Sequence, residues 1–227
     1  MIPLAVIRAE PGASVSVAAA RAAGFEAAAY PLFEVHAAPW DAPAPDMIDA
    51  LLIGSANALR HGGAALAQYR DKLVYAVGET TGQAAREAGF RIAQVGEGGL
   101  QRLLARVTPE HRRLLRLTGD ERIALDPRTC TITERVVYTV RALPVPPALR
   151  TLLATGAVAM VHSAAAALRL ANECPPPNRS IIALALIGPR LIEAAGTGWS
   201  AIAVAASPDE RALLAAARGL CQGWAED

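Results

Sequence analysis

Residues 73–96 read LVYAVGETTGQAAREAGFRIAQVG, and this stretch decides the fold of the chain. Its first five residues form a short apolar run that is typical of a buried strand, and Gly78 ends the run. Residues 83–88 place alanines at helical spacing and are followed by a glycine, as helix C-termini commonly are. Residues 92–95 form a second apolar run. Strand, turn, helix and strand in this order predict one βαβ unit whose strands are parallel.

The same order of patterns returns later in the chain. Residues 182–187 are apolar, residues 190–195 have a helical pattern, and residues 201–205 form the next apolar run. A second resemblance joins residues 51–60 to residues 159–169. Repeats this far apart indicate two similar domains, because solenoid proteins repeat with periods of about 20 to 50 residues.

Proline-rich segments divide the expected strands into two sets. Five expected strands lie between the segments 39–45 and 144–147, at residues 48–53, 73–77, 92–95, 114–117 and 134–143. Five more lie outside them, at residues 3–7, 27–30, 157–161, 182–187 and 201–205. Each set alternates with helices, so the sequence predicts an α/β fold of two similar domains. Each domain is expected to be a small parallel five-stranded sheet with helices on both faces.

This division makes the first domain discontinuous. We expect domain 1 to comprise residues 1–36 and 144–227, and domain 2 to be inserted at residues 37–143. Two contiguous halves that divide near residue 110 are the simpler alternative. Residues 121–133 lack a helical period and are expected to be irregular, and residues 175–178 are expected to form a loop.

Hydroxyl side chains stand where two of the helices are expected to begin. Thr80 and Thr81 follow Gly78 and can cap the helix of the opening stretch. Ser207 precedes a proline and a nearby glutamate, which is a well-formed start for a helix over residues 208–220.

Composition limits the classes of function. The chain has 227 residues, of which 53 % are hydrophobic and 19 % charged, as expected of a globular protein. A net charge of +1 gives no reason to expect a nucleic-acid partner. Cys130, Cys174 and Cys221 match no metal-binding or disulfide spacing. We find no membrane-length apolar run and no signal peptide, so the expected compartment is the reducing cytoplasm.

Open parallel sheets bind ligands at the carboxyl ends of their strands, where helices begin. In the inserted domain these turns are Gly54-Ser55-Ala56-Asn57, Gly78-Glu79-Thr80-Thr81, Gly96-Glu97-Gly98-Gly99 and Thr118-Gly119-Asp120. In the other domain they are Arg8 to Gly12, His162-Ser163-Ala164, Gly188-Pro189-Arg190 and Ser207-Pro208-Asp209. Small residues, hydroxyls and backbone N–H groups at helix starts bind carboxylates or phosphates. Two such domains predict a cleft for a ligand with many negative groups.

An ordered set of short motifs carries a family resemblance. The motifs are Val6-Ile7-Arg8-Ala9-Glu10-Pro11-Gly12, Gly54-Ser55-Ala56-Asn57-Ala58, Tyr75 to Thr81 continuing to Phe90, Val136-Val137-Tyr138, His162-Ser163-Ala164 and Ile187-Gly188-Pro189. Together they resemble uroporphyrinogen-III synthase nearly from end to end. The order of the motifs carries the resemblance, since none of them is specific alone.

The resemblance implies a reaction as well as a fold. Members of this family have two α/β domains joined by a two-stranded linker, with the first domain discontinuous. They convert the linear octacarboxylate hydroxymethylbilane to uroporphyrinogen III in tetrapyrrole (heme) biosynthesis. Water leaves, the macrocycle closes and the last pyrrole ring is inverted through a spirocyclic intermediate. The implied enzyme is a monomeric hydro-lyase without a metal or an organic cofactor.

The resemblance also implies roles for single residues. Tyr138 matches the tyrosine expected to assist departure of the hydroxyl group, although it could equally be a packed strand aromatic, and Thr80 is the second catalytic candidate. The substrate-binding candidates are Arg8, Ser55, Ala56, Asn57, Gly78, Thr81, Gly119, Ser163, Ala164, Gly188, Pro189 and Arg190. The hydroxyl residues among them could instead serve as helix caps, and Arg8 could be a solvated strand-end arginine.

Two departures from the family pattern concern Arg190 and residues 121–133. Arg190 stands where hydroxyl residues are usual, and the 121–133 segment lacks the usual helix, which leaves one face of the central sheet in question. The pair His162-Ser163 has no G-x-S-x-G context, so a serine hydrolase is not expected. The alternative function is that of a non-catalytic two-lobed protein that binds small anions, since a fold does not fix chemistry.

Overall fold

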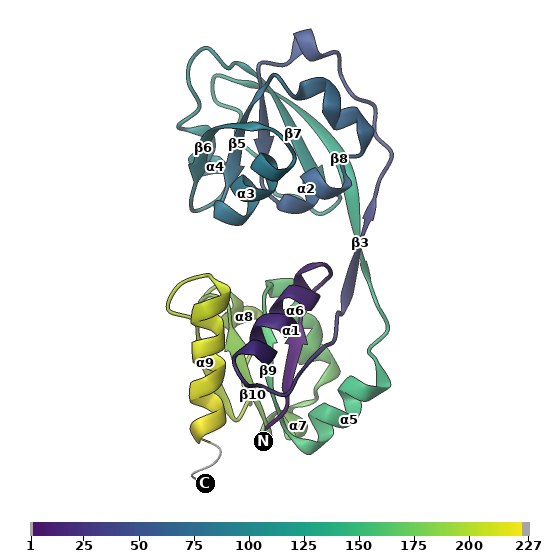
Figure 1. Ribbon diagram of the computed structural model, residues 1–227, viewed down its shortest axis with the longest axis vertical. Coiled ribbons are helices and arrows are strands. Elements are labelled where there is room, and N and C mark those ends of the chain that lie inside the picture. The colour runs from purple at the N-terminus through teal and green to yellow at the C-terminus, as the bar shows by residue number, and fades with distance from the viewer. Residues whose placement is uncertain (1, 224–227) are drawn as a thin grey trace. The chain divides into compact units, whose positions relative to one another are not determined.

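The computed structural model describes residues 2–223, and within them the chain divides into two compact units (Figure 1). Unit 1 comprises residues 2–34 with 142–223, and unit 2 comprises residues 35–141. Residues 1 and 224–227, the ends of the predicted first domain, lie outside the described residues. The chain therefore passes twice from one unit to the other.

Unit 1 contains one five-stranded sheet in which every neighbouring pair is parallel. Its strand order is β11-β10-β9-β1-β2, with β1 (Leu4–Ile7), β2 (Ala27–Ala29), β9 (Ala157–Val161), β10 (Ile182–Leu186) and β11 (Ala201–Val204). All residues of β1, β9 and β10 are buried, as continuous apolar runs in a parallel sheet predict. The five parallel strands predicted for this domain are confirmed.

Helices cover both faces of the unit 1 sheet (Figure 1). One face packs against α1 (Gly12–Ala22) and α9 (Glu210–Gly223), and the other against α5 (Pro147–Thr155), α6 (Ala164–Glu173) and α8 (Leu191–Ala195). The period-two alternation of a strand explains the division, since Leu4 and Val6 face α1 and α9 while Ala5 and Ile7 face the other helices. The loop predicted at residues 175–178 is wrong, because Pro176–Arg179 forms a single helical turn, α7. Proline is pre-organised for the first position of a helix.

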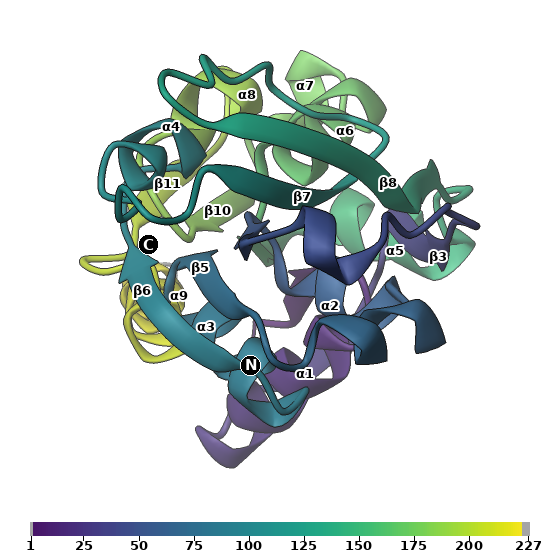
Figure 2. The same ribbon diagram turned by 90° about the horizontal axis from the view of Figure 1, so that it is seen from above.

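Unit 2 contains a six-stranded sheet. Its order is β3-β8-β7-β4-β5-β6, with β3 (Phe33–Ala37), β4 (Ala50–Ile53), β5 (Leu73–Val77), β6 (Arg91–Gly96), β7 (Arg113–Gly119) and β8 (Thr131–Ala142). From β8 to β6 every neighbouring pair is parallel, so the five predicted parallel strands are present. In Figure 2, β7 and β8 lie side by side, as do β5 and β6.

Strand β3 is the sixth strand of this sheet. The sequence pattern does not predict it as a strand distinct from the proline-rich segment 39–45 that follows. The Ala38 backbone N–H donates to the Val137 carbonyl at 2.9 Å, and the Leu143 N–H donates to the Leu32 carbonyl at 2.9 Å. Residue numbers rise along one strand as they fall along the other, so β3 and β8 are antiparallel. They form the two-stranded linker that the family resemblance implied.

The two faces of the unit 2 sheet are covered differently. On one face lie α2 (Ala56–His61), the 3₁₀ helix η2 (Ala64–Tyr69) and α3 (Glu79–Glu87). The other face is covered by α4 (Leu100–Leu104) and by part of the irregular segment before β8, including Leu125. A further 3₁₀ turn, η1 (Pro45–Met47), precedes β4.

Residues 120–130 contain no helix or strand, as predicted, but residues 131–133, also expected to be irregular, begin strand β8 because they pair with β7. Side chains hold the backbone of the irregular segment in place. The Gln101 amide group donates to the Asp126 carbonyl at 3.1 Å and accepts from the Asp126 N–H at 2.9 Å. Arg116, which is only 3 % exposed, donates through Nη1 to the Ile123 carbonyl at 2.9 Å. These hydrogen bonds hold the segment in place where the family resemblance implied a helix.

Two of the predicted side-chain caps, those of α3 and α9, are wrong. Helix α3 begins at Glu79 with Gly78 at its N-cap, so Thr80 and Thr81 lie inside its first turn and cap nothing. Helix α9 begins at Glu210, and the carboxylate of Asp209 accepts the Ala212 N–H at 2.9 Å. The cap of α9 is therefore Asp209, and the Ser207 hydroxyl donates to that carboxylate.

Asp49 ties the start of β4 to the start of β7. Its carboxylate accepts the backbone N–H groups of Arg112 and Arg113 at 2.9 and 2.8 Å. The Arg113 guanidinium donates to the same carboxylate at 2.6 and 3.0 Å. The hydrogen bond from the Arg113 side chain lowers the pKa of Asp49 to about 2; burial acts in the opposite direction, and the two backbone N–H groups add to the lowering.

Asp49→Asn is expected to reduce the free energy of unfolding near pH 7 by about 1–2 kcal/mol, because the depressed pKa favours the folded state. That stabilisation is complete above the unfolded pKa and is lost as the pH falls toward the folded value of about 2. Urea unfolding of both proteins between about pH 7 and pH 3 should therefore show converging stabilities. Asp71→Asn, at a side chain that is 68 % exposed, is the control. A stability difference that stays constant with pH would contradict the assignment.

Candidate functional site

Parallel strands collect the predicted site residues at the carboxyl edge of each sheet. In unit 1 the edge carries Arg8 after β1, Ser163 and Ala164 after β9, and Gly188, Pro189 and Arg190 after β10. In unit 2 it carries Ser55, Ala56 and Asn57 after β4, Gly78, Thr80 and Thr81 after β5, and Gly119 with Tyr138 where β7 and β8 pair. The predicted residues thus form two groups, one on each unit.

The two serine turns have the same local structure. Ser55 is the N-cap of α2 and its hydroxyl accepts the Asn57 N–H at 3.2 Å. Ser163 is the N-cap of α6 and its hydroxyl accepts the Ala166 N–H at 3.2 Å. Both serines have extended backbone with φ near −150°, so the sequence repeat is a repeat of capped helix starts. Capping and ligand binding are compatible, because further N–H groups of the first turn point outward.

Helix α3 begins without a side-chain cap. Its N-cap is Gly78, whose φ of 76° lies in the left-handed region that favours glycine. With no side chain to accept them, the first N–H groups of α3 are open to an anionic ligand. Thr80 is exposed beside them, whereas Thr81 is only 5 % exposed. Of the two threonines, Thr80 alone presents its side chain to solvent.

Arg8 is engaged by partners inside unit 1. Its Nη1 donates to the Ser16 hydroxyl at 2.9 Å and pairs with Oε2 of Glu210 at 3.1 Å. The guanidinium also packs over Gly12, where an added Cβ would lie 2.3 Å from Nε of Arg8. Arg8 is therefore not a purely solvated strand-end arginine. Because its Nη1 is already bound, the two sides of its guanidinium are not both open to a carboxylate ligand.

His162 completes this cluster without forming a catalytic triad. Its Nε2 lies 3.2 Å from Oε2 of Glu210 and 3.4 Å from the Ser16 hydroxyl. A serine–histidine–acid relay needs both ring nitrogens, and here the serine and the glutamate share one. Burial alone would raise the pKa of Glu210, but the hydrogen bond and charge of His162, with Ser16 and Arg8, outweigh burial and hold that pKa below its usual value.

Arg190 is an exposed cation at the unit 1 edge. It immediately precedes α8, and within residues 2–223 its guanidinium forms no hydrogen bond or ion pair. Pro189 beside it is exposed, and Gly188 is half-buried with open space where a Cβ would stand. Arg190 can therefore replace the hydroxyl contacts of the family pattern with a guanidinium, which recognises carboxylates.

Tyr138 lies on β8 beside Gly119, the last residue of β7. Its ring is half-buried against the α2 side of the sheet, and its centroid is 6.3 Å from that of His61. Burial, followed by the charges of Arg60 and His36, lowers the pKa of His61. The tyrosine ring thus lies near a histidine whose neutral form is favoured.

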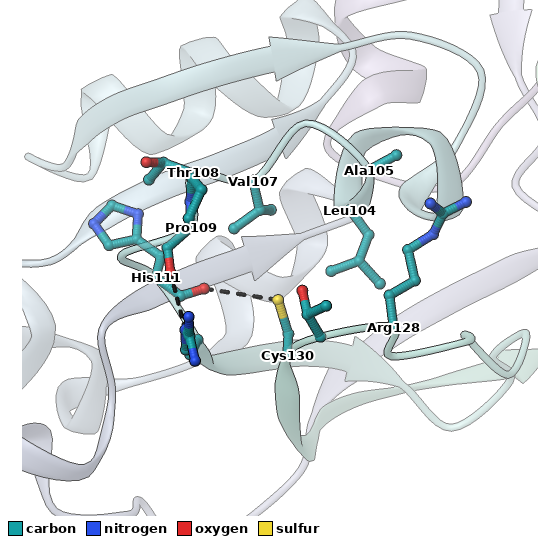
Figure 3. A pocket seen from close by; sticks show the side chains of 10 residues that line it. Leu104, Ala105, Val107, Thr108, Pro109, His111, Arg128 and Cys130 are labelled. Carbon is teal, nitrogen blue, oxygen red and sulfur yellow. Dashed lines mark hydrogen bonds between the residues drawn. The ribbon is translucent and has the colours of Figure 1, made fainter.

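The pocket in Figure 3, of about 400 Å³, lies at the opposite edge of the unit 2 sheet. Its lining includes Val107, Thr108, His111, Arg128 and Cys130, which precede β7 or β8, and none of the predicted site residues. Several of its polar groups are bound within unit 2. The Tyr75 hydroxyl binds Nδ1 of His111 at 2.9 Å and accepts the Thr108 N–H at 3.2 Å, and the Cys130 thiol donates to the His111 carbonyl. These contacts serve folding.

The residues that the structure describes lack two other kinds of feature. Among residues 2–223, no group of three or more His, Cys, Asp or Glu side chains is placed to hold a metal ion. None of the helices described is both long and apolar enough to cross a membrane.

Comparison with known protein families identifies the family of this chain. Residues 14–215 match the sequence profile of a family described as uroporphyrinogen-III synthase HemD. The chain belongs to the uroporphyrinogen-III synthase family. The resemblance seen in the sequence is confirmed, and the function of the chain lies in tetrapyrrole biosynthesis.

Solved structures share the fold. A uroporphyrinogen-III synthetase from Helicobacter pylori is 17 % identical over 97 % of this chain and 100 % of its own, with a TM-score of 0.68. A mutant uroporphyrinogen III synthase from Thermus thermophilus is 17 % identical over the whole of both chains, with a TM-score of 0.58. No curated protein matches the sequence. At this identity the two structures support the two-unit α/β fold of a uroporphyrinogen-III synthase.

Sequence patterns missed several residues of the two edges. Ser16 and Glu210 bind Arg8, and His61 lies beside Tyr138. No local signal could have paired them, because the partners are up to 202 positions apart along the chain. The sequence pattern indicates Glu210 only as part of a helix start.

Ser163→Asp is expected to keep the stability of the protein, since aspartate also caps helices and suits the positive end of α6. The added negative charge should raise KM for hydroxymethylbilane about tenfold, equivalent to roughly 1.4 kcal/mol of repulsion of a substrate carboxylate. Thermal unfolding and steady-state kinetics check both statements.

Two further variants make this test specific. Ser163→Ala should lose about 1 kcal/mol of stability by removing the cap. Ser180→Asp adds the same charge at the opposite edge of the unit 1 sheet, before β10, and should leave KM unchanged. If KM of Ser163→Asp equals that of the wild type, Ser163 is a cap alone.

Proposed function

We propose that this chain is the hydro-lyase that converts hydroxymethylbilane to uroporphyrinogen III. In this reaction the hydroxyl group leaves as water, the macrocycle closes and the last pyrrole ring is inverted through a spirocyclic intermediate. The observation that carries the proposal is the family match over residues 14–215, which spans parts of both units and nearly all of the predicted site residues.

The carboxyl edges supply groups suited to the substrate carboxylates. Helices α3 and α6 each direct first-turn N–H groups and the positive end of the helix dipole outward from these edges. Thr80 and Arg190 add an exposed hydroxyl and an exposed guanidinium. We propose that Ser55, Gly78, Thr80, Ser163 and Arg190 hold propionate and acetate groups. Because the net charge is only +1, this local geometry has to supply the attraction.

Tyr138 is the proposed catalytic residue. Departure of the hydroxyl group as water requires a proton on the leaving oxygen, and a phenol can donate a hydrogen bond or a proton to it. Holding the chain ends close enough to react supplies much of the remaining acceleration, since good orientation is worth roughly 7–11 kcal/mol. Arg8, already bound by Glu210, is proposed to shape its turn and to contact substrate only with its outer edge.

Three accompanying properties are also proposals. We propose that the enzyme needs neither a metal nor an organic cofactor, that it acts as a monomer and that it works in the cytoplasm. The three cysteines, Cys130, Cys174 and Cys221, are all free thiols, in keeping with a reducing compartment. Size measurement in solution and activity after treatment with a chelator test the first two properties.

A coupled assay tests the proposed reaction. Hydroxymethylbilane is generated in place, the protein is added, and the type I and type III uroporphyrin isomers are separated after oxidation. We expect predominantly type III. Type I alone, the product of unassisted closure, from a folded sample would overturn the enzyme and leave the alternative, a two-lobed protein that binds small anions.

Tyr138→Phe is expected to lower kcat about 10- to 100-fold, because it removes the hydroxyl that assists the leaving group. Stability should change little, since the ring and its packing remain. Tyr30→Phe, a half-buried tyrosine of unit 1, is the matched control and should keep the wild-type rate. An unchanged kcat for Tyr138→Phe would remove its catalytic role.

A further inference from the structure

A β-bulge lies where Tyr138 joins the sheet. Thr118 of β7 is aligned with Val136 of β8, but the next residue, Gly119, is aligned with Tyr138. Val137 is therefore the extra residue of β8. Without it Gly119 would be aligned with Val137, and Tyr138 would point to the other face of the sheet. With it, Val137 and Tyr138 both pack on the face covered by α2 and α3.

Gly119 provides the space into which the tyrosine ring then fits. A Cβ on Gly119 would lie 2.6 Å from Cε2, 2.8 Å from Cζ and 3.1 Å from the hydroxyl oxygen of Tyr138. Distances under 3.0 Å are too short for real carbon contacts, so any larger residue must displace the ring. The phenol therefore lies across the end of β7 because position 119 has no side chain.

Asp120 fixes the backbone just beyond the bulge. Its Oδ1 accepts the N–H of Val140 at 3.3 Å and that of Glu121 at 3.1 Å. The first of these hydrogen bonds ties the turn after β7 to β8, two residues past Tyr138. The ring of His61 on α2 lies near the phenol ring, with the ring centroids 6.3 Å apart and the two ring planes inclined by 43°.

We infer that Gly119 and Asp120 position Tyr138 for catalysis rather than bind substrate. This assigns a physical role to the Thr118-Gly119-Asp120 turn, which the sequence indicated only as an anion-binding turn. The inference rests on the proposed function, since it supposes that the Tyr138 hydroxyl acts in the reaction. Gly119 acts through the space it leaves, and Asp120 acts through the backbone that carries the ring.

The kinetic test uses Gly119→Ala. The added methyl group displaces the phenol, so kcat should fall about tenfold or more, because misplacement by an ångström can cost two orders of magnitude. KM should stay within about twofold, since a positioning residue does not contribute to substrate binding. Gly219→Ala, in α9 with open space around the new methyl group, is the matched control and should keep the wild-type kinetics.

A double variant separates positioning from an independent role. If Gly119 acts only through Tyr138, then Gly119→Ala combined with Tyr138→Phe should have a kcat within about twofold of Tyr138→Phe alone. Asp120→Ala should also lower kcat, whereas Asp120→Asn keeps an acceptor oxygen for Val140 and should restore most of it. Rate losses that multiply in the double variant would overturn the inference.

A spectroscopic measurement tests the geometry without the reaction. The chain has four tyrosines, and labelling their ring Cζ with ¹³C gives one signal for each. Tyr138→Phe identifies its signal by removing it. Gly119→Ala should shift the Tyr138 signal and leave the other three in place, and Gly219→Ala should shift none. A Tyr138 signal that does not move in Gly119→Ala would overturn the inference.

The two proposals fail in different ways. If the wild-type protein yields only type I product, the proposed function fails, while the ¹³C measurement still reports whether Gly119 sets the position of the ring. If the wild type yields type III and Gly119→Ala keeps the wild-type kcat, the positioning inference fails and the proposed function stands.

Discussion

Strand β8 is hydrogen-bonded to β7 on one edge over Thr131 to Tyr138 and to the β3 segment on the other edge from Val137 onward, and the place of Tyr138 depends on this double pairing. Over Thr131 to Tyr138 it pairs in parallel with β7 and extends the central sheet. On its other edge it pairs antiparallel with β3, from which the chain enters the unit. A strand with both edges paired cannot slip in register without breaking hydrogen bonds on each side, so the residue it carries at the end of β7 has a fixed place.

Parallel pairing explains why the candidate residues gather although the chain separates them. All strands of a parallel sheet end at the same edge, and the helices that follow begin there with unpaired N–H groups. Each unit thus creates an edge suited to carboxylates without any excess of positive charge. The helix starts at these edges differ: Ser55 and Ser163 cap α2 and α6 with their side chains, whereas Gly78 has no side chain to cap α3. An uncapped helix start retains more of its capacity to bind an anion.

Some predicted features succeeded because the signal was local. Apolar runs bounded by glycine marked the parallel strands, and the absence of a helical period marked the irregular segment as far as residue 130, since β8 begins one residue later. The errors arose where neighbours in space decide. Thr80 and Thr81 have suitable side chains for a cap, but the helix begins earlier, at Glu79. Strand β3 has little pattern of its own and becomes a strand because β8 offers it a free edge.

By itself the sequence determined the fold class, the positions of ten strands along the chain and the turns that carry the candidate residues, because strand periodicity and glycine turns are properties of consecutive residues. The tertiary structure decided which groups meet. Arg8 binds Ser16 of α1 and Glu210 of α9, two helices from opposite ends of the chain. Tyr138 lies on the α2 side of the sheet because a β-bulge aligns it with Gly119. Such contacts depend on register and on the space between strands, which only the folded sheet sets.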